Sequence, residues 1–226
     1  MDEGWARFVF DRFGMPFISV RNEMIRAGEL NEFLDVLVIP SISGRQLDRG
    51  RGSGSVPEEY AGGLAPEGAA AVEAFVKAGG RLVTLGSSSA WAIGLFDLPL
   101  SDVTRGEDSG EFSCPGSVLR VVPEESDFTI GLPDSQAIFF SGSAAWRETK
   151  EAKDDARELD VLMRYAPTRV LYSGWIRDAK VIEGQAAWVR AGHGKGSAHL
   201  FGFRPQYRGW SQAAFKLLFR SIFFGE

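Results

Sequence analysis

A turn of three consecutive serines is the feature of this sequence best suited to chemistry. Ser87, Ser88 and Ser89 follow Gly86, which ends the apolar run 81–86 (RLVTLG), and a helix is predicted to start there. A hydroxyl on such a turn can attack a carbonyl carbon, because the N–H groups at the helix start stabilise the oxyanion that forms. The reaction needs a base within reach of the hydroxyl. Without one, we favour Ser88 or Ser89 as the cap of the following helix.

Few bases are available to such a serine. The histidines are His193, in the glycine-rich stretch 192–197, and His199, in the apolar run 198–203. A histidine in a glycine-rich turn is typically solvated, and a strand histidine typically belongs to the core. Neither position therefore predicts a catalytic base.

A second polar group follows the run 198–203, where Arg204 and Gln206 flank Pro205. Arginine cannot act as a general base, because its pKa stays above about 12 in proteins. The amide of Gln206 cannot replace a carboxylate that orients a histidine. Two interpretations of Arg204 stay open: it forms an ion pair with an acidic neighbour at the strand end, or it binds an anion facing the serine turn.

Three other stretches predict no site of their own. Cys114 has no neighbouring base or cationic cluster, which is typical of an unreactive turn residue. The glycine-rich stretches 50–55 and 192–197 lack the helix start that a phosphate-binding loop requires. Two histidines and one cysteine are too few for a typical zinc site, so we expect no metal and no cofactor.

Composition limits the partners of this chain. Its 226 residues carry a net charge of −5, which argues against nucleic acid or an anionic membrane as a partner. Arg45, Arg49 and Arg51 are a local exception, and a role in docking an acidic partner stays open. No run approaches the roughly 18 apolar residues that span a bilayer, and charged residues interrupt any signal peptide. The compartment of the chain stays undetermined.

The elements that position these residues alternate between helices and strands. Residues 41–63 separate them as a long segment rich in Ser, Gly and Arg, typical of a disordered or functional loop. The alternation indicates a doubly wound α/β fold with a mostly parallel sheet. Helices are predicted at 2–13, within 24–33, from Pro66 to Gly79-Gly80, from Ser88 or Ser89 onward, and at 211–224; strands are predicted at 16–20, 36–40 and 81–86.

Residues from about 100 to 190 predict a mixed or antiparallel β region added to that core. Pro, Gly and acidic turns separate its apolar segments. We expect one domain over residues 1–226. The predicted strands of the region are 118–123, 137–140, 161–166 and 169–175, and 186–191 with 198–203 form a hairpin.

Several motifs together resemble the C-terminal region of bacterial zinc carboxypeptidases of the carboxypeptidase A type. They are 60–93 (containing AGGRLVTLGSSSAWAI), 112–121 (FSCPGSVLRV) and 199–208 (HLFGFRPQYR), and 2–5 (DEGW) fits the start of that region. The resemblance covers nearly the whole chain. It implies a flavodoxin-like domain of the class I glutamine amidotransferase type, following a peptidase domain in a secreted or periplasmic parent protein.

The resemblance also assigns roles to the polar positions. Ser87, or an adjacent serine such as Ser88, stands where the family keeps its cysteine nucleophile. Arg204 and Gln206 stand where it keeps histidine and glutamate. All three depart from the catalytic pattern, and no zinc-binding motif of the peptidase is present, which implies a non-catalytic accessory domain. The alternatives are a serine-dependent hydrolase or acyltransferase using the 87–89 turn, and a module for homo-oligomerisation. The candidate ligand-binding residues are Tyr60, Gly63, Gly86, Ser87 and Arg204.

The predicted order of elements lacks one strand. A doubly wound domain normally opens with a strand, whereas residues 2–13 predict a helix. We therefore expect the sheet to hold either an unfilled slot or a strand supplied by a neighbouring chain.

Overall fold

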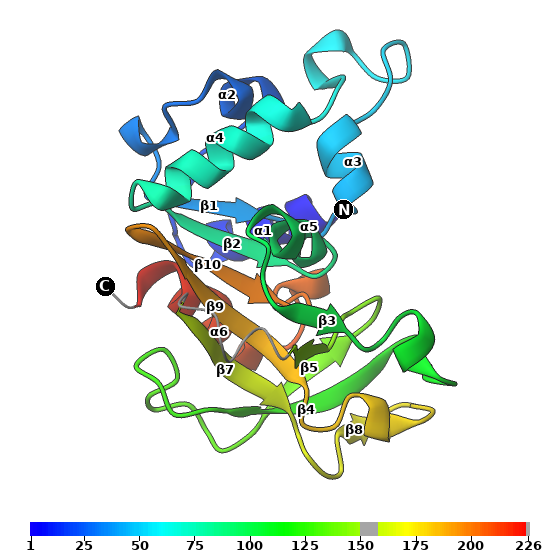
Figure 1. Ribbon diagram of the computed structural model, residues 1–226. Coiled ribbons are helices and arrows are strands. Elements are labelled where there is room, and N and C mark those ends of the chain that lie inside the picture. Colours follow the sequence, from blue (N-terminus) through cyan, green and yellow to red (C-terminus); the bar gives the residue numbers. More distant parts are fainter. Residues whose placement is uncertain (150–157, 225–226) are drawn as a thin grey trace.

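One mixed sheet runs through the protein in the computed structural model, which describes residues 1–149 and 158–224 (Figure 1). The strand order along the sheet is β1-β2-β10-β9-β7-β4-β5, and β3, β6 and β8 attach beside this path. The strands are β1 (Val36–Ile39), β2 (Arg81–Leu85), β3 (Leu100–Asp102), β4 (Ser117–Pro123), β5 (Gln136–Phe140), β6 (Trp146–Glu148), β7 (Leu159–Tyr165), β8 (Leu171–Ser173), β9 (Ala186–His193) and β10 (Gly196–Phe201).

The parallel part of the sheet consists of β1, β2 and β10. These strands are apolar runs covered on both faces, as parallel strands normally are. The other pairs among the described strands are antiparallel. The parallel part is thus narrower than the predicted mostly parallel sheet, because turns between the later strands bring antiparallel neighbours together, whereas a parallel pair needs a crossover.

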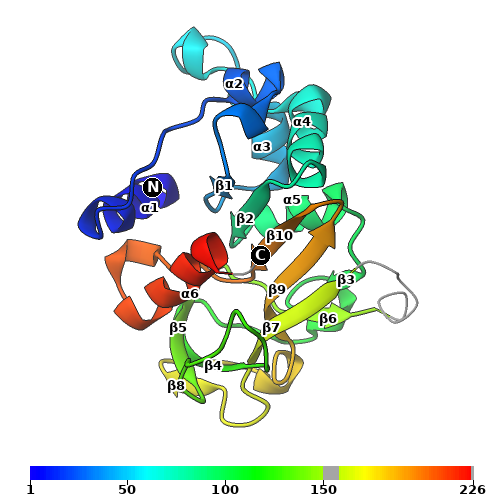
Figure 2. The same cartoon turned by 90° about the vertical axis from the view of Figure 1, so that its left-hand side faces the viewer.

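Helices cover both faces of this parallel core, so the predicted α/β class is confirmed (Figures 1 and 2). On one face, Leu82 packs in a cluster with residues of the second to fifth helices; on the other, Val83 and Leu85 pack with residues of the first and sixth. The helices are α1 (Asp2–Arg12), α2 (Asn22–Ala27), α3 (Gly44–Arg49), α4 (Ala65–Lys77), α5 (Ser88–Leu95) and α6 (Gln212–Phe223).

Elements with strong local signals form as predicted. The helix ending before Gly79-Gly80 is α4, the late hairpin is β9 with β10, and the terminal helix is α6. A short helix also forms within 24–33, as the end of α2, and the short helix η1 (Leu30–Glu32) follows it. The predicted strand 169–175 needs correction, because only β8 forms there. Within the predicted β region, residues 150–157 lie outside the described residues.

Two corrections concern the chain before α4. The long loop 41–63 holds α3 and the short helix η2 (Glu58–Tyr60), so it is more ordered than predicted. The predicted strand 16–20 does not form, although its residues are mostly apolar. A strand needs a neighbour for its backbone hydrogen bonds, and no described strand pairs with residues 16–20.

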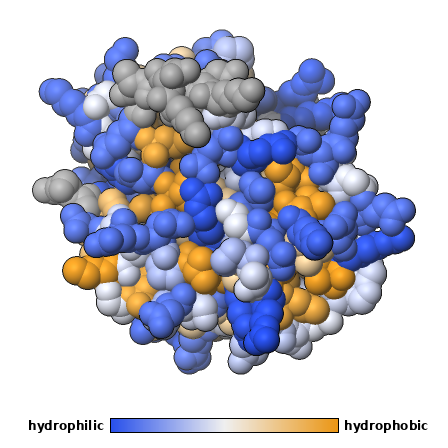
Figure 3. Space-filling view, turned by 60° about the horizontal axis from the view of Figure 1, so that its bottom comes forward, coloured by the Kyte–Doolittle hydropathy of each residue, from blue (hydrophilic) through white to orange (hydrophobic). Residues whose placement is uncertain are grey.

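In the described ranges 1–149 and 158–224, no helix is both long and apolar enough to cross a bilayer. On the face that carries β4 and β8, apolar side chains lie in separate patches among hydrophilic ones (Figure 3). That face therefore presents no continuous apolar surface.

Candidate functional site

The carboxyl ends of the three parallel strands meet at one place, where open α/β sheets generally bind ligands. Ser41 follows β1, Gly86 follows β2 and Arg204 follows β10. Gly86 has a φ of +60°, and a Cβ at this position would lie 2.8 Å from Ser41 Oγ and 3.0 Å from Arg204 Cγ. Glycine is required by both the backbone conformation and the lack of space. The strand ends therefore close tightly around the turn that starts α5.

The hydroxyls of Ser88 and Ser89 are fully buried and join neighbouring strands. Ser88 Oγ donates to the carbonyl oxygen of Ile39 in β1 over 3.1 Å, and Ser89 Oγ donates to that of Phe201 in β10 over 2.8 Å. Neither caps α5, and the N-cap residue Ser87 makes no side-chain cap bond either. The predicted capping role is therefore wrong, because these hydroxyls bond to the sheet instead of the first helical turn.

Ser87 is the one serine of the turn that is partly exposed. Its backbone N–H donates to Ser41 Oγ over 3.1 Å. This bond ties the start of α5 to the residue that follows the end of β1. The donor that an oxyanion would use at such a turn is the N–H of the residue after the nucleophile, which here is Ser88.

His199 lies away from this turn. In the register of β10 with β2 it is level with Val83, three residues before Gly86. At the usual rise per residue this separation is on the order of 10 Å, beyond proton-transfer reach. The ring is fully buried between Phe128 and Trp188, with centroid distances of 4.9 and 5.9 Å.

The surroundings of His199 favour its neutral form. Burial, and after it the charges of Arg81 and Arg190, lower the pKa of His199 well below its ordinary value of 6.5. His193 lies at the opposite end of β10 from the turn, with its Nε2 3.5 Å from Glu73 Oε1 in α4. Neither histidine therefore serves Ser87 as a base.

Arg204 is held by groups from three parts of the chain. Its guanidinium donates to Asp2 Oδ1 in α1 over 2.9 Å and to the carbonyl oxygen of Ser141 over 2.7 Å. It also lies 3.7 Å from the ring centroid of Tyr207, in the short helix η6 (Tyr207–Gly209). The Arg204 and Asp2 side chains are only 13% and 16% exposed. The ion-pair interpretation is confirmed, and the helix α1 closes over this end of the site.

The other predicted site residues have different surroundings. Gln206 is fully buried, and neither of its amide atoms has a partner in the part of the chain that the structure describes. Tyr60 is 54% exposed beside Arg21, 5.5 Å from the ring centroid, and the carbonyl oxygen of Gly63 accepts a hydrogen bond from Arg26. Of the five ligand-binding candidates, the contacts bring together Gly86, Ser87 and Arg204, whereas Tyr60 and Gly63 lie beside α2.

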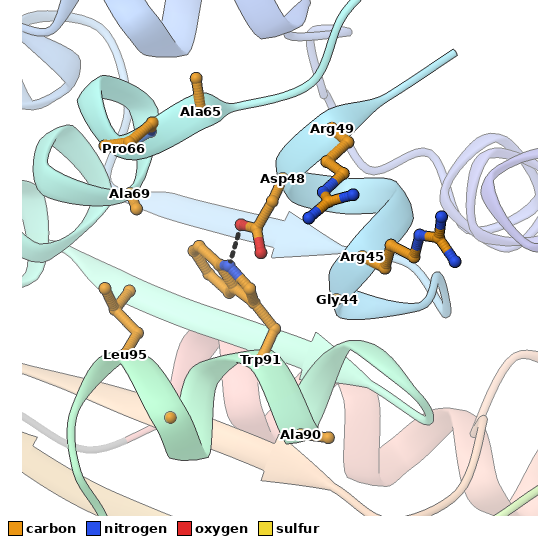
Figure 4. A pocket seen from close by; sticks show the side chains of 11 residues that line it. Gly44, Arg45, Asp48, Arg49, Ala65, Pro66, Ala69, Ala90, Trp91 and Leu95 are labelled. Atoms are coloured by element: carbon orange, nitrogen blue, oxygen red, sulfur yellow. Dashed lines mark hydrogen bonds between the residues drawn. The ribbon is translucent and has the colours of Figure 1, made fainter.

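A second candidate site is an open groove between α3, α4 and α5 (Figure 4). Its volume is about 870 Å³, within the range of small-molecule sites. The lining residues are Gly44, Arg45, Asp48, Arg49, Ala65, Pro66, Ala69, Ala90, Trp91, Gly94 and Leu95.

The groove combines an aromatic wall with two cations. The Trp91 indole donates its N–H to Asp48 Oδ1 over 2.7 Å, which fixes the ring and occupies one carboxylate oxygen. Arg45 and Arg49 also line a neighbouring hollow of about 410 Å³, and no ion pair involves either residue within the described ranges. Sequence reasoning missed this groove, because α3 was expected to be loop and its i, i+4 arginine pair was not recognised.

The remaining candidates for chemistry are consistent with a structural role. Cys114 is buried, and burial raises the pKa of its thiol, which keeps the thiol protonated and poorly reactive. Among the described residues, no group of three or more His, Cys, Asp or Glu side chains could hold a metal ion.

Comparison with known proteins identifies the fold. No protein-family model and no curated protein matches the sequence. A solved cytoplasmic protein of Salmonella typhimurium is similar over 96% of this chain and 84% of its own, with a TM-score of 0.57 and 14% identity. A Thermoplasma acidophilum protein, described as a candidate component of GMP synthase, is similar over 96% of this chain and 85% of its own, with a TM-score of 0.51 and 12% identity.

A ThuA-like protein from Bacteroides uniformis gives a TM-score of 0.49 at 12% identity, over 89% of this chain and 71% of its own. Identities this low bear on the fold alone. The chain has a curled, mixed-sheet α/β fold, which it shares with the Salmonella and Thermoplasma proteins.

Proposed function

We propose that this chain is a non-catalytic glutamine amidotransferase-like accessory domain that acts by binding. The observation that carries the proposal is the internal pairing of the turn where a nucleophile is expected. The Ser87 N–H is bonded to Ser41, the Ser88 hydroxyl is buried, and Arg204 is paired with Asp2. No histidine of the described chain is within reach of Ser87. A serine hydrolase or a glutaminase requires a base within reach of its nucleophile at this place.

A covalent probe tests the absence of catalysis. We expect a fluorophosphonate to leave the folded chain unlabelled between pH 6 and 9 (about the range in which a serine–histidine pair would react), and glutamine to be left unhydrolysed. Labelling that is lost in Ser87→Ala but kept in Ser88→Ala would overturn the proposal in favour of a serine hydrolase.

The finer part of the proposal is a parent protein of the zinc carboxypeptidase type. Its support is the resemblance of the 60–93, 112–121 and 199–208 motifs. A chain of this kind is expected to bind a peptidase domain of that type from which the matching C-terminal region has been removed. Calorimetric titration of the two purified proteins tests this, and absence of heat at the highest soluble concentration contradicts it.

We place ligand binding in the α3–α4–α5 groove, because Arg204 at the strand ends already has an internal partner. Arg45 and Arg49, which form no ion pair with any described residue, and the apolar wall around the Trp91 indole fit a small molecule with a flat apolar body and an anionic group. Phenyl phosphate is a suitable probe, with neutral benzyl alcohol as its control. Arg49→Ala is expected to weaken phenyl phosphate binding at least about tenfold, the loss of one charged hydrogen bond.

Arg51→Ala is the matched control, because Arg51 does not line the groove. Equal loss in both variants would indicate general charge attraction and contradict a built site. If binding depends on Arg204 instead, the ligand site lies at the carboxyl ends of the parallel strands and not in the groove.

A further inference from the structure

The β1 edge of the sheet has backbone groups without partners. Strand β1 ends the sheet, and its one described neighbour is β2. Asp35 faces β2, because its carbonyl oxygen accepts from the Arg81 N–H over 3.0 Å. Alternate residues of a strand direct their N–H and C=O to opposite sides, so those of Val36 and Val38 face away from β2. No backbone hydrogen bond to either residue from outside the sheet is present in the described chain.

The other end of the sheet is protected. Strand β5 ends it, and the carbonyl oxygen of Ala137 accepts from Ser211 Oγ over 3.0 Å. The ring of Tyr207 stacks on Phe139 with a centroid distance of 5.5 Å. Within β1 itself, whose sequence is Val-Leu-Val-Ile, no charge or proline blocks the edge, and Asp35 and Pro40 lie only at its ends.

Residues 15–20 pass the free side of β1 without pairing with it (Figure 2). Met15 packs against the core cluster on the α1 and α6 face, and Val20 packs against the cluster on the α4 and α5 face, so this segment crosses the edge of the sheet. Residues 16–20 make no backbone hydrogen bond in the described chain. Phe17 and Ile18 are 38% and 56% exposed. Two unpaired apolar segments therefore flank the same edge.

We propose that this edge accepts a β-strand from a partner polypeptide, which pairs with β1 on one side and runs beside residues 16–20. An extended backbone pairs with the outward N–H and C=O groups of Val36 and Val38 in succession, as a small molecule does not, which favours a peptide as the ligand. Both faces of β1 are apolar, so we expect the inserted strand to carry uncharged, apolar side chains on both of its faces. Parallel direction continues the β1–β2–β10 arrangement.

A second copy of this chain fits the edge less well than a separate strand. Two copies meeting through β1 would each bring residues 15–20 to the edge, so the two segments would meet before the strands did. A single strand enters beside one such segment only. The proposal does not depend on the serine turn being inactive, and its test uses neither Ser87 nor Arg204.

The test uses the full chain and a blocked, fluorescent peptide, Lys-Val-Ile-Val-Ile-Val-Lys. Its control is the same peptide with alternate backbone nitrogens methylated, which keeps the side chains and charge but removes strand pairing. We expect saturable binding of the first peptide, measured by fluorescence anisotropy, and at least about tenfold weaker binding of the methylated one, since several backbone hydrogen bonds are lost. Hydrogen exchange at the Val36 and Val38 amides is expected to slow on binding.

Val38→Pro and Val38→Thr form the matched variants. Proline removes the outward N–H without taking a bond from β2, whereas threonine keeps the N–H and the side-chain shape. Binding is expected to fall at least about tenfold in the proline variant and to stay within about twofold in the threonine variant. The methylated peptide keeps the test decisive if the proline variant does not fold.

Three outcomes would overturn the proposal. Equal binding of both peptides would show side-chain adhesion only. Slow exchange at Val36 and Val38 in the isolated monomer would show that the chain already closes its own edge. A concentration-dependent dimer that Val38→Pro dissociates, measured by light scattering, would make a second copy the occupant instead.

Discussion

The serine turn and the His199 region contain the two kinds of group that a hydrolase would combine, and the fold treats them in opposite ways. At the turn, buried polar groups are paired: Ser88 and Ser89 bond to strands on either side of β2. Around His199, burial comes without pairing, because both ring nitrogens and the Trp188 indole N–H lack partners in the described chain. The hydroxyls of Ser88 and Ser89 therefore link strands of the sheet, whereas burial favours the neutral form of the His199 imidazole.

This contrast also shows why one substitution would not restore a catalytic site. A nucleophile at Ser87 would still lack a base, and a histidine at position 204 would lie beside the carboxylate of Asp2 and under helix α1. The base that does exist is separated from the turn by three strand positions. A catalytic site at this place would therefore require a different packing of α1 as well as different site residues.

The largest expected effect comes from Arg204→Ala. This change leaves the Asp2 carboxylate, 16% exposed, without its partner and removes a donor from Ser141. We expect the free energy of unfolding to fall by about 3 kcal/mol, the lower end for breaking a buried ion pair. Urea denaturation measures it, with Arg7→Ala as control on the same helix, where the Glu3 pair is exposed and a change within about 0.5 kcal/mol is expected. Similar losses in both variants would contradict the closure of the site by α1.

The paired serines predict the next largest effect. Ser88→Ala removes the buried hydroxyl that bonds to Ile39, and we expect a loss of about 2 kcal/mol in urea denaturation. Ser87→Ala changes a partly exposed side chain and is expected to stay within about 0.5 kcal/mol. A larger loss of stability in Ser87→Ala than in Ser88→Ala would contradict the structural role of the buried hydroxyl.

These effects separate what the sequence could predict from what it could not. The run 81–86 and Gly79-Gly80 carry strong local signals, so the position of the turn was predictable. The ion pair of Arg204 with Asp2 joins residues 202 positions apart, and only the folded chain brings them together. The failed strand 16–20 is the reverse case: its local pattern is right, but a strand also needs a neighbour, which local patterns do not report.

The register of the later strands was likewise beyond reach of the sequence. The predicted hairpin of β9 with β10 forms, because its two strands are adjacent in the chain. By contrast, β7 pairs with β9 through two register shifts, and β6 contacts β9 at a single pair of residues. Such pairings depend on packing between distant segments, which alternation of apolar residues does not specify.

The pH dependence of stability tests the burial of His199. The pKa of His199 is lowered in the folded chain, so below its ordinary value of 6.5 the unfolded chain binds a proton that the folded chain does not. The free energy of unfolding therefore falls as the pH drops below 6.5, by up to about 1.4 kcal/mol per pH unit from this group, until the folded-state pKa is reached. Denaturation of wild type and His199→Leu across this range measures the difference. His193→Leu is the control, and an unchanged acid slope in His199→Leu would contradict a buried neutral imidazole.

Cys114 gives the smallest expected effect and extends the comparison to a third buried group. Its thiol is 7% exposed, and burial raises its pKa, so very little reactive thiolate is available at neutral pH. An aromatic disulfide reagent is expected to react with the native chain at a rate set by transient opening, and to react at once in urea. Adding urea below the unfolding transition should then raise the labelling rate in step with the loss of stability. Fast labelling of the native chain would show that burial does not keep the Cys114 thiol protonated and unreactive. Burial alone would then not be a sufficient reason for a neutral His199 imidazole either.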